Sequence, residues 1–403
     1  MSSWISCQKI VANLWQCYTS VSEATSLHFG PEQKGQDLIT LSQQIIDHKP
    51  NVISFIDHRP HPLDLLQYLI PMWIKEHGDF PEIIFHVYGD FTLNYHKWAA
   101  LGSLIKGIKT KFCAASTAEQ KLLEKLMLQK THLVPFPVNQ EEFSPDEDLR
   151  IKKRNELKVS DQQKVFIFTG RLSYQKNIHL LVEKFLSYVE SKNSTDILLI
   201  FGHFDDLGDS FTDYRPVIGQ YYHQVENILK DHPRREQIRF MGMASSQELK
   251  GYYNASDFLI NLSTHNDEDF GMSVAEASLC GLASILTAWG GFHDFAFTSN
   301  KYLNVTIHPK KMIDFDQFQD HLTQSSNYDR GALAIAAAAQ FSIGQGGATK
   351  LKVMLNSPSG PFKEYSSLFF QVQRSALYSQ RPYLDIEHKL NSLYQELYES
   401  YLG

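Results

Sequence analysis

Short apolar runs alternate with longer amphipathic segments along most of the chain. The runs have the length and composition of buried strands and cover residues 51–56, 82–87, 131–134, 164–169, 196–201, 237–241, 258–261 and 283–286. Amphipathic segments such as 178–188 and 247–254 lie between them and have apolar residues at helical spacing. Strands that alternate with helices predict an α/β protein with parallel sheets covered by helices on both faces.

A polar, charge-rich stretch over residues 139–163 interrupts this alternation. It contains Ser144-Pro145 and the charged run DEDLRIKKR at residues 146–154, a composition typical of a domain boundary. Because 403 residues also favour two domains, we predict an N-terminal domain over 1–150 and a C-terminal domain over 151–383. Residues 384–403 have apolar positions at helical spacing and are predicted to form a closing helix.

Composition narrows the class of protein. The net charge of −7 argues against a protein that coats nucleic acid. Neither a close C-x-x-C pair nor a zinc-ligand spacing occurs among the four cysteines, so we expect reduced thiols and a cytoplasmic location. The N-terminus lacks the pattern of a signal peptide, and there is no apolar stretch of the roughly 20 residues that a membrane span needs.

The first cluster that indicates chemistry follows the predicted strand 164–169. Gly170 and Arg171 come directly after the strand, and Lys176 comes just before the next helix. Ligands of open parallel sheets bind at this end of the strands, where a glycine lets the backbone approach an anion and a helix start presents N–H groups. The two cations and the loop therefore suit a diphosphate. The alternative is that Arg171 and Lys176 are solvated charges around an ordinary turn.

A second cluster lies a hundred residues further along the chain. Glu268 precedes a glycine turn at Gly271, and Glu276 lies about two turns into the helix that follows. Glu276 is placed to accept hydrogen bonds from a ribose diol, and Glu268 to orient sugar hydroxyls, while the N–H groups around residues 271–273 face an anion. Gly290-Gly291 follows another short strand and leaves room for a ligand. The alternative is that Glu268 complements the helix dipole, Glu276 is exposed to solvent, and Gly290-Gly291 forms an ordinary tight turn.

Together these motifs resemble the family 4 retaining glycosyltransferases of the GT-B fold. The resemblance covers residues 164–300 and comprises G-R-x-x-x-x-K-N at 170–177 and E-x7-E at 268–276, with matching segments at 240–242, 248–249 and 252–257 in between. It implies two Rossmann-like domains facing across a cleft, with the C-terminal helix crossing back to the N-terminal domain. The N-terminal half contains fewer of the family's motifs. His86 resembles the family's strand-end histidine, but the Gly-Gly loop of many members is replaced by CYTSVS at residues 17–22.

The resemblance also implies a function. We expect a hexose-type sugar to pass, with retention of configuration, from a UDP- or GDP-sugar to a glycan or lipid-linked acceptor in cell-envelope polysaccharide synthesis, with the nucleotide sugar as co-substrate and no metal. The expected catalytic residues are His86, Arg171, Lys176 and Glu268. The expected donor-binding residues are Gly170, Phe270, Gly271, Met272, Ser273 and Glu276. The alternatives are a non-catalytic, degenerate relative that binds a nucleotide sugar or a partner, and, with less support from these motifs, a nucleotide-sugar 2-epimerase.

A cluster of lysines in the N-terminal half suggests a second, weaker hypothesis. An apolar stripe accompanies it, formed by Trp98, Leu101, Leu104, Ile105 and Ile108. The two features together would suit peripheral contact with the inner face of a membrane. The favoured interpretation is a helix that buries this stripe in its domain core. The lysines concerned are Lys106, Lys109, Lys111, Lys121, Lys125 and Lys130.

Overall fold

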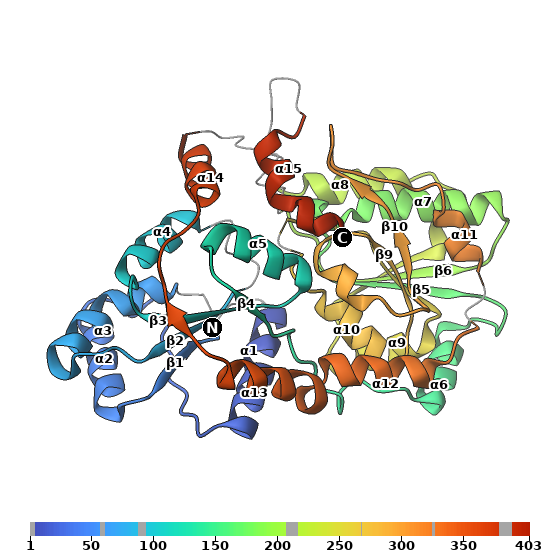
Figure 1. Cartoon of the computed structure of the whole chain (residues 1–403). Coiled ribbons are helices and arrows are strands. Elements are labelled where there is room, and N and C mark those ends of the chain that lie inside the picture. The colour runs from blue at the N-terminus through green and yellow to red at the C-terminus, as the bar shows by residue number, and fades with distance from the viewer. Residues whose placement is uncertain are drawn as a thin grey trace. The chain divides into compact units, whose positions relative to one another are not determined.

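The computed structural model describes residues 5–56, 61–87, 94–206, 217–266, 268–324, 327–378 and 389–403. These residues form two compact units, each with its own sheet and flanking helices (Figure 1). Unit 1 comprises Met1–Val138 and Phe341–Ser379, and unit 2 comprises Asn139–Gln340 and Gln380–Gly403. The predicted α/β class is therefore confirmed.

Unit 1 is built on a sheet with the strand order β1-β2-β3-β4, in which all four strands are parallel. The strands are β1 (Val52–Phe55), β2 (Glu82–His86), β3 (Lys109–Ala114) and β4 (Thr131–Leu133), and β13 (Gly360–Pro361) adds a short antiparallel edge to β3. The helices are α1 (Ile5–Val21), α2 (Gln36–His48), α3 (Pro62–His77), α4 (Tyr95–Leu104), α5 (Thr117–Met127), η4 (Ile343–Ala348), α13 (Thr349–Asn356) and α14 (Ser367–Tyr378).

Unit 2 is built on a six-stranded parallel sheet with the order β10-β9-β8-β5-β6-β7. The strands are β5 (Val165–Thr169), β6 (Ile197–Phe201), β7 (Ile238–Gly242), β8 (Phe258–Asn261), β9 (Ser284–Thr287) and β10 (Lys301–Leu303), and β11 (Val305–Thr306) pairs with β12 (Met312–Ile313) outside this sheet. The α-helices are α6 (Glu147–Leu157), α7 (Ile178–Ser191), α8 (Gln220–Leu229), α9 (Ser246–Ala255), α10 (Met272–Leu279), α11 (Phe318–Thr323), α12 (Arg330–Phe341) and α15 (Ser392–Tyr398). The 3-10 helices are η1 (Tyr174–Lys176), η2 (Arg235–Gln237), η3 (Gly290–Phe295) and η5 (Glu399–Leu402).

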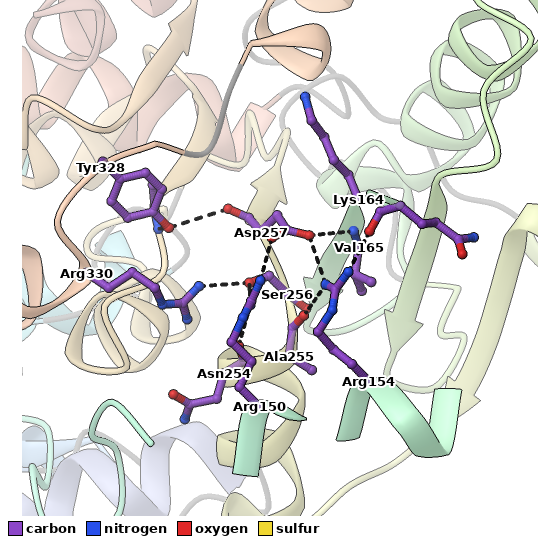
Figure 2. Close-up of polar contacts among 12 residues, drawn as sticks. Arg150, Arg154, Lys164, Val165, Asn254, Ala255, Ser256, Asp257, Tyr328 and Arg330 are labelled. Atoms are coloured by element: carbon purple, nitrogen blue, oxygen red, sulfur yellow. Dashed lines mark hydrogen bonds and ion pairs between the residues drawn. The ribbon is translucent and has the colours of Figure 1, made fainter. Parts of the chain in front are cut away.

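The boundary between the units differs from the predicted one. It falls after Val138 instead of residue 150, because α6 is tied to the end of α9 in unit 2. Arg150 donates hydrogen bonds to the carbonyls of Asn254 and Ser256, and Arg154 donates to the carbonyl of Ala255 (Figure 2). The charged run that indicated a linker is therefore a helix whose arginines are anchored in unit 2.

The path of the C-terminal segment also differs from the prediction. The chain returns to unit 1 through Phe341–Ser379, and the predicted closing helix at 384–403 groups with unit 2, part of it lying outside the described residues. Its described part begins with an extended stretch and forms the short helices α15 and η5. The aromatic rings of Tyr398 and Tyr401 pack against Trp289 and hold this segment on unit 2.

The lysine-rich region of unit 1 follows the favoured interpretation. Trp98, Leu101 and Ile105 are fully buried, so the apolar stripe of α4 belongs to the core. Lys111 is buried as well. It lies within β3, a strand that the apolar pattern did not reveal, and its Nζ is 3.0 Å from Oε1 of Glu82. Its inclusion among the surface lysines was wrong, because an ion pair stabilises it inside the sheet.

Candidate functional site

The strand order of unit 2 contains a topological switch point between β5 and β8. The chain runs outward through β5, β6 and β7, then returns to the other side of β5 and runs outward again through β8, β9 and β10. The loops after β5 and β8 therefore leave the same edge of the sheet in opposite directions. Ligands of open α/β sheets bind outside the carboxyl ends of the strands at this kind of point.

Contacts between the two loops bring the predicted motifs together. Asn177, with a left-handed φ of 54°, donates from Nδ2 to the carbonyl of Leu262 at 2.8 Å and to Oγ1 of Thr264 at 3.1 Å. The N–H of Thr264 donates to the carbonyl of Gln175 at 3.4 Å. The G-R-x-x-x-x-K-N loop is thus fastened to the segment that leads to Glu268.

The first loop begins where the ends of β5 and β6 approach each other closely. Gly170 has a φ of 151°, and its N–H donates to the carbonyl of Phe201 at the end of β6. A Cβ placed on the neighbouring Gly202 would lie 1.9 Å from the carbonyl oxygen of Gly170. The ends of β5 and β6 therefore approach too closely for a side chain at position 202, and their backbones form one edge of the site.

Two of the four predicted catalytic side chains meet directly. Nζ of Lys176 forms an ion pair with Oε2 of Glu268, and both side chains are largely buried. Arg171 lies on the same loop as Lys176 and pairs through Nη1 with Oδ2 of Asp205 at 3.1 Å. Asp205 lies just beyond β6, and the motifs did not predict its contact with Arg171.

The start of α10 supplies the predicted helix N-terminus. Gly271 precedes the helix with a φ of 114°, and a Cβ there would lie 2.8 Å from the ring of Phe292. Gly271 has no side chain to cap the helix, and its carbonyl accepts hydrogen bonds from the N–H groups of Val274 and Ala275. The N–H groups of the preceding residues, Met272 and Ser273, have no acceptor within the helix, which favours an anion. Phe270 is buried and packs against Phe295.

Glu276 is buried on α10 and contacts a residue that the sequence analysis missed. The hydroxyl of Tyr253 donates to Oε2 of Glu276 at 3.4 Å and lies 2.7 Å from Oγ1 of Thr169, the last residue of β5. Tyr253 therefore links the end of β5 with Glu276, the residue expected to bind the ribose. Its position within the segment 252–257, quoted only as a matching motif, was the one available signal.

The cations of the site influence the titration of a histidine in the same loop. His265 is partly buried in the loop between β8 and Glu268. Burial, followed by the charges of Lys176, Arg171 and Lys311, holds the pKa of this imidazole well below its usual value of 6.5. Three cations near one buried loop favour an anionic ligand and disfavour a protonated histidine.

This pKa shift predicts a dependence of stability on pH. Because the pKa of His265 is lower in the folded than in the unfolded protein, the unfolded chain takes up the proton first as the pH falls below 6.5. The stability that the neutral His265 contributes is therefore fully present above pH 6.5. Below pH 6.5 the free energy of unfolding falls by up to about 1.4 kcal/mol per pH unit. Urea unfolding at about pH 7.5 and about pH 5.5 measures this effect. Between the two pH values the free energy of unfolding should decrease less for His265→Gln than for the wild type.

The matched control is His223→Gln on α8, where the side chain is 69% exposed. The control should retain the wild-type loss between the two pH values. An equal loss in the wild type and in His265→Gln would contradict the assignment.

His86 belongs to unit 1, whereas the other predicted catalytic residues belong to unit 2. It is the last residue of β2 and is buried, with Nε2 2.8 Å from the hydroxyl of Tyr18. This hydroxyl is also 2.5 Å from Oγ of Ser54. Burial raises the pKa of the Tyr18 phenol, so it stays neutral and orients the imidazole. Tyr18 belongs to the CYTSVS segment, for which the sequence suggested no role.

Metal ligands and membrane-spanning helices are the remaining features to consider. Within the described ranges, no group of three or more His, Cys, Asp or Glu side chains is arranged to hold a metal ion. In the same part of the chain, every helix is too short or too polar to cross a membrane.

Comparison with known proteins finds a family match within unit 2. Residues 150–312 match the family described as Glycosyl transferases group 1. An uncharacterized glycosyltransferase of Methanocaldococcus jannaschii is 25% identical over 206 residues, which cover 51% of this chain and 46% of the relative. The alpha-monoglucosyldiacylglycerol synthase of Streptococcus pneumoniae is 22% identical over 230 residues, covering 53% and 47%. The chain thus matches about half the length of these curated relatives.

Solved structures establish the fold. Anabaena HepE in complex with UDP superposes with a TM-score of 0.67 at 12% identity, over 89% of this chain and 97% of that chain. HepE in complex with UDP-glucose gives a TM-score of 0.58 at 13% identity, over 80% and 82%. The two units, each with a parallel sheet, therefore have the GT-B fold.

Proposed function

We propose that this protein is a retaining glycosyltransferase that moves a hexose-type sugar from a UDP- or GDP-sugar to a glycan or glycolipid acceptor. The observation that carries the proposal is the meeting of Lys176 and Glu268 at the switch point between β5 and β8, beside Arg171 and the start of α10. This arrangement combines cations and helix N–H groups for a diphosphate with a carboxylate for sugar hydroxyls. The match to Glycosyl transferases group 1 covers all of these residues.

The mechanism follows from where charge develops. When the bond between the sugar and the phosphate breaks, negative charge grows on the β-phosphate. Arg171, Lys176 and the first N–H groups of α10 stabilise that charge. Glu268 orients the sugar hydroxyls and Glu276 accepts hydrogen bonds from the ribose. The acceptor attacks the sugar on the same face from which the nucleoside diphosphate departs, so the configuration is retained. The departing phosphate helps to remove the proton of the acceptor hydroxyl.

His86 is proposed to act from unit 1. Its imidazole is held by Tyr18, so one ring nitrogen already has a fixed partner. The imidazole, or the backbone carbonyl of the residue, is proposed to contact the donor sugar. Either contact would stabilise the sugar as positive charge develops at its anomeric carbon.

The comparisons favour particular donors and acceptors for the first experiments. The HepE structures contain UDP, UDP-glucose, or UDP and glucose, which makes UDP-glucose the first donor to test. The name of the streptococcal relative describes a glucosylated diacylglycerol, which supports a lipid acceptor beside a glycan one. We propose a role in cell-envelope polysaccharide synthesis at the cytoplasmic side of the membrane, without a metal requirement.

The direct test is donor turnover. UDP-, GDP- and ADP-sugars are incubated separately with the protein and a cell-envelope glycan or lipid extract, and release of the nucleoside diphosphate is measured with added Mg²⁺ and with EDTA. We expect one donor to be consumed, equally in both conditions, and proton NMR of the product to show the anomeric configuration of the donor. Inversion would contradict the retaining mechanism, and loss of turnover in EDTA would contradict metal independence.

The non-catalytic alternative makes the opposite prediction. A degenerate relative would bind a nucleotide sugar without consuming it in any extract. Neither the described residues nor the comparisons supply an observation in its favour, since the Lys176–Glu268 pair and both flanking loops are intact. Binding without turnover across the whole panel would establish it.

A further inference from the structure

The last described segment of the chain packs on the Gly-Gly loop of unit 2. The ring centroids of Tyr401 and Trp289 are 5.4 Å apart, and the carbonyl of Tyr401 lies 3.1 Å from Nε2 of His293. A Cβ at Gly290 would lie 3.1 Å from the Tyr401 ring. Glycine at this position therefore leaves space for the aromatic side chain of the closing segment.

The same segment reaches the loop that carries Glu268. The hydroxyl of Tyr394, on α15, donates to Oδ1 of Asn266 at 2.9 Å. Nζ of Lys311 donates to the same oxygen at 2.9 Å and to the carbonyl of Thr264 at 2.8 Å. The Lys311 ammonium also lies 5.6 Å from the centroid of the Tyr394 ring and 5.4 Å from that of Trp289. A buried amide two residues before Glu268 is thus fixed by two donors.

Further bonds hold the backbone of this loop. The indole Nε1 of Trp289 donates to the carbonyl of His265 at 2.7 Å, and the N–H of Gly291 donates to the carbonyl of Glu268 at 2.8 Å. A Cβ at Gly290 would lie 2.4 Å from that Glu268 carbonyl oxygen. These bonds connect His265 and Glu268 to the Gly-Gly turn.

We propose that Tyr394 and Lys311 are positioning residues for Glu268, so that the closing segment sets how the protein recognises the sugar of its donor. The inference rests on the proposed function, because it assigns Glu268 to the sugar hydroxyls. Hydrogen bonds to Asn266 and to the Thr264 carbonyl restrain the loop, and the restraint places the Glu268 carboxylate beside Lys176. Without them the loop relaxes, and the carboxylate loses its fixed position although its chemistry is unchanged.

The test separates recognition of the sugar from recognition of the nucleotide. Tyr394→Phe removes the hydroxyl and keeps the ring, and titration calorimetry measures its affinity for UDP and for UDP-glucose. We expect affinity for UDP-glucose to fall about 5- to 10-fold, the range of one lost hydrogen bond, while affinity for UDP changes less than about 2-fold. Lys311→Met, which removes the bonds to Asn266 and to the Thr264 carbonyl, should change the ratio of the two affinities in the same direction.

The matched control is Tyr188→Phe. Tyr188 is buried in the same unit, and its hydroxyl donates to Oδ2 of Asp196 at 2.7 Å, at the opposite end of β6 from the site. Its loss should leave the ratio of UDP to UDP-glucose affinity unchanged. A double variant with Glu268→Gln provides a second readout. If Tyr394 acts through Glu268, adding Tyr394→Phe to Glu268→Gln should cause little further loss.

The possible outcomes distinguish this inference from the proposed function. If the wild type binds neither UDP nor UDP-glucose, and the corresponding GDP pair also fails, the proposed function fails. If the wild type binds and Tyr394→Phe retains its ratio, or weakens both ligands equally, the positioning role is overturned while the proposed function stands.

Discussion

Turnover by Lys176→Met is expected to fall about 10²- to 10³-fold, with the donor KM changing much less. Lys176 stabilises charge that is small in the bound donor and large in the transition state, so its loss mainly raises the barrier to bond cleavage. Arg171→Ala should cause a loss of the same order, because its guanidinium lies on the same loop. Steady-state kinetics with the donor identified by the turnover panel provide the measurement.

A structural effect must be separated from a chemical one. Removing the Lys176 ammonium leaves the largely buried Glu268 carboxylate without its ion-pair partner, which itself costs stability. The double variant Lys176→Met with Glu268→Gln avoids this buried charge and should fold like the wild type, yet remain inactive. Lys184→Met, on the exposed surface of α7, is the matched control and should retain turnover. Near-normal activity of both Arg171→Ala and Lys176→Met would refute the proposed site.

Asp257→Ala is expected to lower the free energy of unfolding by about 3–5 kcal/mol. Figure 2 shows the reason: guanidinium groups from α6 and α12 gather at the end of α9, around Asp257. Arg150 lies 2.9 Å from Oδ1 of Asp257 and Arg154 lies 3.2 Å from Oδ2. Arg330 donates to the carbonyl of Ser256 at 2.9 Å. Without the carboxylate, the guanidinium groups of Arg150 and Arg154 lose their negatively charged partner and keep hydrogen bonds to backbone carbonyls.

The carboxylate also has a role in the sheet. Oδ2 of Asp257 accepts a hydrogen bond from the N–H of Val165 at 2.8 Å, at the start of β5. Urea unfolding of Asp257→Ala and Asp257→Asn measures the cost, and the asparagine variant should be the less affected because it keeps an acceptor. Glu156→Gln, an exposed partner of Lys153 on α6, should change the midpoint far less. A shift for Asp257→Ala no larger than that of Glu156→Gln would contradict this account.

The meeting of the G-R-x-x-x-x-K-N and E-x7-E motifs could be predicted because both lie close to strand ends. Gly170, Lys176, Glu268 and Gly271 each precede or follow a strand or helix whose apolar pattern is visible in the sequence. The parallel pairing of β5 with β8 then brings the two motifs to one edge of the sheet. No knowledge of side-chain packing was required for that step.

The contacts that complete the site could not be predicted in this way. Tyr253, Asp205, Tyr394 and Lys311 contact site loops through tertiary packing, and only Tyr253 lies in a segment that resembles the family. Strand β3 was missed because Lys109, Thr110 and Lys111 read as polar, although the last two are buried. Local pattern does not reveal a buried lysine whose partner is 29 residues away.

The return of the chain to unit 1 is a further example. Gly346 and Gly347 belong to η4, and a Cβ at Gly347 would lie 2.9 Å from Sγ of Cys17. A glycine pair therefore does lie beside the CYTSVS segment, but it comes from the other end of the sequence. Only tertiary structure could show that these segments meet.

The most direct test of the central claim is titration calorimetry of UDP and GDP into the wild type and into the double variant Arg171→Ala with Lys176→Ala. The claim is that the loops at the switch point of unit 2 bind a nucleoside diphosphate. We expect the wild type to bind one of the two nucleotides, and the double variant, although folded, to bind it at least about 100-fold more weakly because two charged contacts are lost. Equal affinity in the two proteins, or no binding of either nucleotide by the wild type, would contradict it.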